Sequence, residues 1–389
     1  MKPSDRIAGQ KPYYFDTLNR SINRLTSEGV DIIRLDIGSP DLPPAPFIIE
    51  ALVSGAAKPD QHGYAPYAGT LDFREAVRDY YDQRFGVELD PETEILGLIG
   101  SKEGIFHISQ AFLNPGDLVL IPQPAYPTYL SGARVSGAEV FPIPLREQTG
   151  FIPDLDEIPI EIARRAKILW LNYPNNPTGA VADVPIFRKI VEFAMEHQIL
   201  ICHDAPYMEI YFGESRPPSI LEIPGANEVA IEFNSLSKTY NMAGWRVGMA
   251  AGNSTVIGFL HALKMQIDTS TFIPIQSAAA AALRGDQTWL VERNRIYRER
   301  METVVAGFRQ ANLDALAPSA TIYVWLKLPD VRDDSRFCSD LLEATGVSIT
   351  PGSVYGDAGL GFVRVSLCTP AERIAEAMDR VVDWMKVRI

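Results

Sequence analysis

The chain has 389 residues, 46% of them hydrophobic and 22% charged, and 36 basic against 49 acidic residues give a net charge of −13. This length predicts two or three domains, and the composition excludes a disordered, collagen-like or coiled-coil chain. The acidic balance argues against nucleic acid as a partner, because phosphate binding needs a basic surface.

The same sequence bears on where the protein works. The first ten residues, MKPSDRIAGQ, lack the apolar core of a secretory signal, and no run of about 18 residues is apolar throughout. Three scattered cysteines match neither a disulfide framework nor a paired-cysteine metal site and favour a reducing compartment. We therefore expect a cytoplasmic protein with no membrane-spanning segment.

A helical pattern over 15–28 comes first and is followed by LDIGSPDLPPAP, which we interpret as a segment crossing between domains. Short apolar runs, with helical patterns such as 186–197 between them, then predict strands at 95–99, 118–121, 168–172, 199–203, 229–233 and 247–251. Continuous apolar strands that alternate with helices predict an α/β fold, with a mostly parallel sheet covered on both faces.

The last hundred residues have another pattern. A long amphipathic helix is predicted over 289–312 and a closing helix over 371–387, with alternating strands at 321–328 and 362–367. Alternation predicts that the strand at 321–328 is buried on one face only. This is the α+β pattern of a second, smaller domain.

Polar motifs follow several of the predicted strands. The sequence NSLSKTY contains Lys238, and Arg246 stands eight residues further on. Alone, this is a strand-end loop with a solvated lysine, as most lysines are. A Walker A phosphate loop is excluded, because Glu232 and Ser237 stand where that motif needs glycine.

Three further strand ends carry NYPNNPTG with Asn176, HDAPY with Asp204 and Tyr207, and GSKEG with Ser101. Their ordinary interpretations are a turn, a helix N-cap and a plain helix start. Their functional interpretation rests on position, because ligands of open α/β sheets bind at the carboxyl ends of the strands. There a helix start at Ser101 would be an anion site, and Asp204 and Tyr207 would reach opposite edges of an aromatic cofactor.

Together these motifs resemble the class I/II aminotransferases, fold-type I enzymes that use pyridoxal 5′-phosphate. SLSKTYNMAGWRVG is highly specific for that family, NYPNNPTGA adds independent support, and the resemblance runs from LDIGSPDLPPAP to FVRVSL. It implies a large cofactor-binding domain over 47–288, with a mostly parallel seven-stranded sheet between helices. The smaller α+β domain would comprise 1–46 and 289–389.

The resemblance implies a role for each matching residue around the cofactor ring. The lysine matching Lys238 forms an imine with the cofactor aldehyde, and the freed amine later carries the proton. The carboxylate matching Asp204 keeps the pyridine nitrogen protonated. Asn176 and Tyr207 match residues that bond the ring oxygen, and Tyr126 matches the aromatic that stacks on the ring; without the family, Tyr126 is equally a core tyrosine.

The remaining matches concern the phosphate and the substrate. Residues matching phosphate ligands are Ser101, Lys102, Ser235 and Arg246. Arg364 matches the arginine that grips the substrate α-carboxylate, near the backbone of Gly38, although by pattern alone it would be an outward-facing strand residue. Tyr64 matches a tyrosine that reaches the phosphate of the partner subunit, which implies a homodimer. Pro206 and Lys102 depart from the usual family pattern.

The stretches IGSKEGIFH, NYPNNPTGA and CHDAPYMEI resemble an LL-diaminopimelate aminotransferase-like subgroup, whose members exchange an amino group with 2-oxoglutarate. Alanine, aspartate, aromatic and methionine specificity stay open, as does a C–S β-lyase on the same scaffold, because pockets change more easily than cofactor sites. A transcription factor fits less well, because the segment before LDIGSP is too short for a helix-turn-helix module. A nucleotide-binding α/β protein is weakened by the failed Walker A match.

Overall fold

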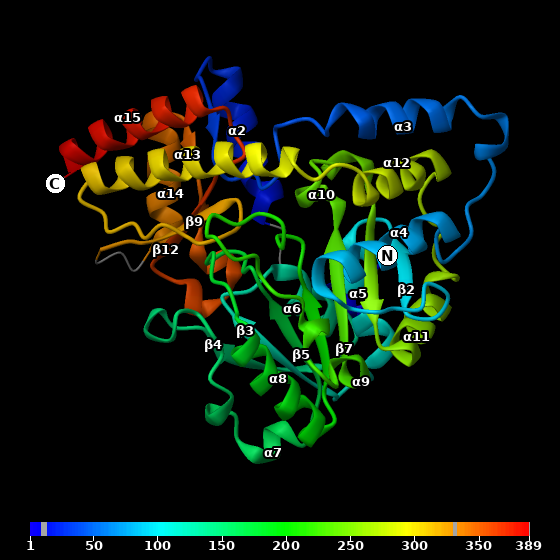
Figure 1. The fold of residues 1–389 in the computed structure, drawn as a ribbon. Helices are drawn as coiled ribbons and strands as arrows, with labels where there is room; N and C mark the ends of the chain where they lie inside the picture. Colours follow the sequence, from blue (N-terminus) through cyan, green and yellow to red (C-terminus); the bar gives the residue numbers. More distant parts are fainter. Residues whose placement is uncertain (9–13, 330–332, 389) are drawn as a thin grey trace.

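The computed structural model describes residues 1–8, 14–329 and 333–388 (Figure 1). A seven-stranded sheet has the order β2-β8-β7-β6-β5-β3-β4, and only β8 runs antiparallel to its neighbours. Its strands are β2 (Ile95–Leu98), β3 (Leu118–Gln123), β4 (Glu139–Pro144), β5 (Ala166–Asn172), β6 (Leu200–Asp204), β7 (Ala230–Ser235) and β8 (Gly248–Gly252). The predicted mostly parallel sheet is confirmed.

Both faces of this sheet are buried. Leu169 and Leu171 of β5 pack in one core, whereas Ile168 and Trp170 pack in another, because successive side chains of a strand point to opposite faces. The first core also takes residues of α3 (Pro46–Ala56), α4 (Leu71–Phe85), α8 (Val184–His197) and α12 (Ile273–Arg284). The second takes residues of α5 (Ser101–Phe112), α6 (Pro127–Val135) and α11 (Ser254–Lys264).

The edge strand β4 was not among the predicted strands. It pairs with β3 alone, contains Pro142 and Pro144, and is largely exposed or half-buried. Proline removes a backbone donor, and an edge strand tolerates this best because one of its sides has no neighbour. The same prolines interrupt the apolar run that would have indicated a strand in the sequence.

A second set of elements packs beside the sheet, at the upper left of Figure 1. It contains an antiparallel sheet ordered β11-β12-β9 and the parallel pair β1-β10. The strands are β1 (Ile33–Arg34), β9 (Tyr323–Lys327), β10 (Val347–Ser348), β11 (Thr350–Pro351) and β12 (Phe362–Ser366). The helices are α2 (Tyr14–Ser27), α13 (Trp289–Gln310), α14 (Asp334–Thr345) and α15 (Ala371–Arg388).

The prediction that the strand at 321–328 is half-buried is wrong. Tyr323 to Leu326 are all buried and only Lys327 is exposed. Val324 and Leu326 belong to the core formed with α13 and α15, whereas the Tyr323 hydroxyl meets Tyr207, which follows β6 of the large sheet. The face that alternation assigns to solvent is covered by the rest of the molecule.

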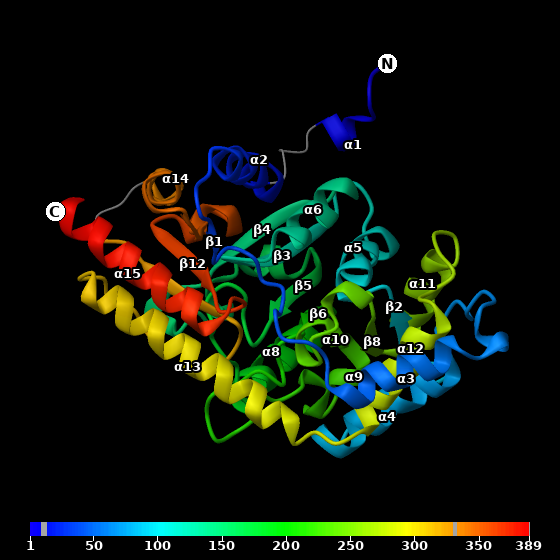
Figure 2. The same ribbon diagram turned by 90° about the horizontal axis from the view of Figure 1, so that it is seen from above.

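The segment after β1 crosses from the small sheet toward the large one (Figure 2). Leu35 accepts a hydrogen bond from the Ser366 amide, and Ser366 Oγ donates to the Ile37 carbonyl. The hydrophobic core around α13 and β9 is distinct from the cores of the large sheet, which supports the division at 46/47 and 288/289, although that division stays a prediction. Within the described residues, no helix has the length and apolarity needed to cross a bilayer.

Candidate active site

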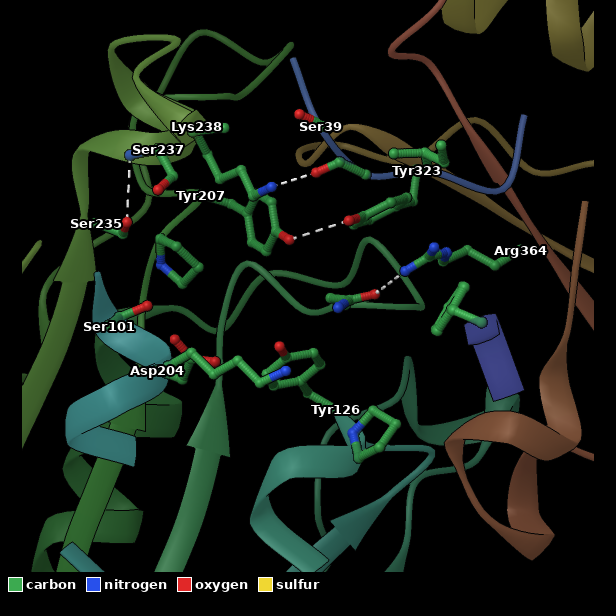
Figure 3. A pocket seen from close by; sticks show the side chains of 18 of the residues that line it. Ser39, Ser101, Tyr126, Asp204, Tyr207, Ser235, Ser237, Lys238, Tyr323 and Arg364 are labelled. Atoms are coloured by element: carbon green, nitrogen blue, oxygen red, sulfur yellow. Dashed lines mark hydrogen bonds between the residues drawn. The ribbon is translucent and has the colours of Figure 1, made fainter. Parts of the chain in front are cut away.

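A cleft of about 480 Å³ lies between the carboxyl ends of β5, β6 and β7 and the small sheet. It brings together nearly all of the predicted site residues (Figure 3): Gly38, Ser101, Lys102, Tyr126, Asn176, Asp204, Tyr207, Ser235, Lys238, Arg246 and Arg364. Tyr64 lies outside the cleft lining, and its side chain is exposed.

One end of the cleft is a cradle of hydrogen-bond donors at the start of α5. Gly100 precedes that helix with φ of 76°, and a Cβ there would lie 2.4 Å from an Arg246 guanidinium nitrogen. Arg246 Nη1 donates to the Ala243 carbonyl at 2.9 Å, and the Ser235 hydroxyl caps the short helix α10 (Leu236–Thr239). The free N–H groups of α5, a guanidinium and serine hydroxyls together suit a phosphate.

The amine of Lys238 points across the cleft. This half-buried residue lies on α10, and its Nζ donates to the Gly38 carbonyl oxygen (Figure 3). Only glycine fits at position 38, because a Cβ would lie 1.8 Å from the Tyr323 hydroxyl oxygen. The backbone of the crossing segment therefore meets the amine directly.

Asp204 ends β6 with one oxygen engaged and the other not. Its Oδ2 accepts a 2.6 Å hydrogen bond from Tyr129, while Oδ1 is buried without a hydrogen-bond partner in the described structure. Burial raises the pKa of Asp204 to about 6, against the Tyr129 hydrogen bond and the positive charges of His203 and Lys238, which lower it. An orphaned carboxylate oxygen inside a cleft needs a donor, and the protonated ring nitrogen of pyridoxal phosphate is one.

The Asp204 carboxylate is expected to destabilise the cofactor-free fold. Its pKa is 3.8 unfolded and about 6 folded, so the folded state holds the proton longer and stability falls as pH rises from about 4 to 6. Above pH 6 the ionised carboxylate lowers the free energy of unfolding of the cofactor-free protein by about 3 kcal/mol. Asp204→Asn should raise the unfolding free energy of the cofactor-free protein above pH 6, and raise it less near pH 4. Urea unfolding at both pH values measures this, and an equal change at both would contradict the assignment.

Two polar side chains line the cleft between Asp204 and the small sheet. The Tyr207 hydroxyl lies 3.2 Å from that of Tyr323. The backbone N–H of Asn176 donates to Asn172 Oδ1 at 2.7 Å, and the side-chain Oδ1 of Asn176 accepts from Arg364. Pro206 lines the cleft beside Tyr207.

Arg364 of β12 is a buried cation that meets no carboxylate among the residues that the structure describes. Its guanidinium donates to the Asp36 carbonyl oxygen at 2.7 Å and to Asn176 Oδ1 at 3.1 Å. It lies 4.0 Å from the centre of the Tyr323 ring, and in the described part of the chain it forms no ion pair. Because a buried unpaired charge is costly, this arrangement suits an anion that enters the cleft.

Sequence reasoning did not single out four residues of this region: Ser237, Tyr323 and Tyr355, which line the cleft, and Tyr129, which donates to Asp204. Two of them stood inside motifs already in view. Tyr129 follows Tyr126 by three residues in PAYPTY, and Ser237 precedes Lys238 in SLSK. Tyr323 lies in the strand whose burial was misjudged, and no motif signals it or Tyr355.

Comparison with known proteins agrees with the aminotransferase family that the motifs resemble. The family model described as aminotransferase class I and II matches residues 30–381. The LL-diaminopimelate aminotransferases of Desulforudis audaxviator and Syntrophobacter fumaroxidans are 48% and 46% identical, each over 97% of this chain and 96% or 97% of the relative. The substrate-bound structure of BacF from Bacillus subtilis superposes with a TM-score of 0.95 and 37% identity, covering 99% of this chain and 98% of that one. A family match over this much of the chain, with relatives this similar along their whole length, leaves one assignment: the chain belongs to the class I and II aminotransferases, which depend on pyridoxal 5′-phosphate.

Proposed function

We propose that this aminotransferase transfers an amino group between LL-diaminopimelate and 2-oxoglutarate, in the cytoplasm and as a homodimer. The reaction type is supported by one observation: the Lys238 amine and the buried Arg364, whose charge has no carboxylate partner among the described residues, line the same cleft. An amino acid whose α-carboxylate binds Arg364 brings its α-carbon toward the amine. The names of the similar enzymes support diaminopimelate as the substrate.

The residues of the cleft divide the work among them. Ser101, Lys102, Ser235 and Arg246 would bind the cofactor phosphate, Tyr126 would stack on the ring, and Asp204 would hold the ring nitrogen. When bound, the cofactor supplies an electron sink for the electrons of the substrate α-carbon. Lys238 would remove the proton of the substrate α-carbon, and Asn176 and Tyr207 would bond the ring oxygen of the cofactor. The Gly38 backbone would lie beside the substrate.

A single-turnover absorbance titration tests the substrate. The purified holoenzyme is mixed with LL-diaminopimelate, L-glutamate, L-aspartate, L-alanine or L-phenylalanine, and the visible cofactor band is followed. We expect diaminopimelate and glutamate to convert the cofactor and the other three to convert it weakly. Conversion by the other three alone would refute the substrate but keep the reaction type. Keto-acid release without an amino acceptor would indicate a lyase instead.

The homodimer is supported by exposed apolar side chains on α3, in the segment after it and at the start of α12. The side chains of Val53, Tyr64, Tyr67 and Phe272 are all exposed, and the Phe272 ring lies 5.7 Å from that of His62. Apolar side chains gathered in this way commonly mark an interface. Tyr64 would then serve the phosphate of the neighbouring subunit.

Complementation between two inactive variants tests this sharing. Lys238→Ala lacks the amine and Tyr64→Ala lacks the partner's phosphate contact. A mixed dimer has one site with both residues intact, so random reassociation should restore roughly a quarter of wild-type activity. Each variant alone, dissociated and reassociated, is the control. Activity of the mixture that equals the mean of the two controls would show that Tyr64 does not act across subunits.

A further inference from the structure

His203 directly precedes Asp204 on β6 but faces the opposite side of the sheet, where its ring lies 5.1 Å from that of Phe187. It is fully buried, and each ring nitrogen has an acceptor in reach. Nδ1 lies 2.8 Å from Glu232 Oε2, and Nε2 lies 3.1 Å from the Tyr173 carbonyl oxygen. A backbone carbonyl only accepts, so Nε2 carries a hydrogen.

The surroundings of Glu232 decide the other ring nitrogen. Its carboxylate is also fully buried and accepts from the Tyr81 hydroxyl at 2.7 Å, from the Ser219 hydroxyl at 3.0 Å and from the Ile220 amide at 3.2 Å. Three donors from the rest of the chain favour the ionised carboxylate, because hydrogen bonds to the charged form stabilise it relative to the acid. Nδ1 of His203 must then donate as well.

The two charges therefore cancel inside the protein. A buried charge is tolerated when it is paired and its remaining hydrogen-bonding capacity is met, and both conditions hold here. On its own face of the sheet the His203 ring contacts Glu232, which in turn accepts from Tyr81. On the cleft side, the next residue Asp204 accepts from Tyr129; burial raises the pKa of Asp204, and the charges of His203 and Lys238 lower it.

The pair lies beneath the loops that form the cleft. Tyr173 comes three residues before Asn176, His203 one before Asp204, and Glu232 on β7 six before Lys238. The β6–β7 register places His203 beside Glu232. The pair and its hydrogen bond to Tyr173 thus join the ends of β5, β6 and β7, each of which leads into a proposed cofactor contact.

We propose that His203 and Glu232 form a buried ion pair that acts as a positioning device for the loops carrying Asn176, Asp204 and Lys238. This inference rests on the proposed roles of those three residues, but not on the identity of the amino-acid substrate. Neither member of the pair touches the cofactor site, so both are positioning residues.

The first test reads the ring directly in the wild-type holoenzyme. The chain has five histidines, so ¹⁵N-histidine labelling gives five imidazole patterns. We expect both ring nitrogens of His203 to carry a hydrogen, as the hydrogen-bond geometry requires, whereas His261, whose pKa is lowered by burial, should have one bare nitrogen at pH 8. Single His→Gln variants at 62, 107, 197 and 261 assign the signals without altering the pair. A His203 ring with one bare nitrogen at pH 8 would overturn the ion pair.

The second test measures cofactor affinity and kcat in variants of the pair. Glu232→Gln removes the negative charge beside His203 and leaves the imidazolium buried without a counter-ion. The loops should therefore shift, weakening cofactor binding at least tenfold and lowering kcat by about 10²-fold. Ser219→Ala is the matched control, because it removes one donor and leaves the pair; its cofactor affinity should stay within about twofold of wild type. The double variant His203→Gln/Glu232→Gln removes both charges and should recover part of the loss.

The outcomes separate cleanly. Wild-type cofactor affinity and kcat in folded Glu232→Gln would overturn the positioning role. If Glu232→Gln does not fold, the imidazole spectrum decides whether the pair exists, and the double variant decides whether its loss disturbs cofactor binding. An enzyme that ignores diaminopimelate but transaminates another amino acid would refute the proposed substrate and leave both tests valid.

Discussion

Replacing Lys238 by alanine is expected to abolish covalent attachment of the cofactor and to reduce turnover by about 10⁴-fold, the upper range for loss of a general acid–base. The variant keeps the donors proposed to bind the cofactor phosphate, because Arg246, Ser235 and the start of α5 are untouched. The variant should therefore still bind pyridoxal phosphate, but borohydride should fix none of it to the protein. Mass spectrometry of the reduced protein measures this.

A second amine in the same cleft provides the control. Lys102 also lines the cleft, with its Nζ 5.9 Å from the centre of the Tyr126 ring. Borohydride treatment of Lys102→Ala should still fix the cofactor to the protein, and mass spectrometry should find it on the peptide that contains Lys238. Cofactor found on Lys102, or still fixed in Lys238→Ala, would show that the amine was wrongly assigned.

Replacing Arg364 by alanine is expected to lower kcat/KM by about 10²–10³-fold, mainly through a higher KM, because truncation of a buried, hydrogen-bonded charge partner costs about 2–5 kcal/mol. Arg364→Lys should recover little, since an ammonium cannot make two parallel bonds to a carboxylate. Steady-state kinetics with the amino acid and with the 2-oxo acid measure both effects.

Cofactor affinity distinguishes this loss from a general collapse of the site. Figure 3 shows Arg364 on the opposite side of the cleft from Ser101 and Ser235, where the phosphate is expected. Cofactor binding should therefore change by no more than about twofold in Arg364→Ala. A wild-type KM for the amino acid would remove Arg364 from the substrate site.

The large sheet could be predicted because its strands are buried on both faces. Such strands, including β5 and β6, are short apolar runs between helical patterns, and the sequence shows both. The edge strand β4 could not be found, because its prolines resemble a loop. The burial of Tyr323 was also misjudged, because it depends on contact with another part of the chain, which alternation along one strand does not report.

The site was predictable where chemistry is written in a local motif and unpredictable where it arises from packing. Lys238, Asn176 and Asp204 each follow a strand in a recognisable order, and the structure gathers them in one cleft. The Tyr129 hydroxyl meets Asp204 from 75 residues away, and the Gly38 carbonyl meets Lys238 from 200 residues away. Such contacts are set by how the sheet, helices and crossing segment pack together.

The long helix α13 passes from the large sheet to the small one (Figure 1). Near its start, Arg293 donates to the Thr239 carbonyl, one residue beyond Lys238; two turns later, Arg300 donates to the Leu367 carbonyl at 3.0 Å, three residues beyond Arg364. Both arginines are buried. The two arginines lie seven residues apart, so about 10 Å of helix, at 1.5 Å per residue, separates their positions along the axis. A helix that does not line the cleft thus joins the two segments that carry the amine and the guanidinium on opposite sides of it.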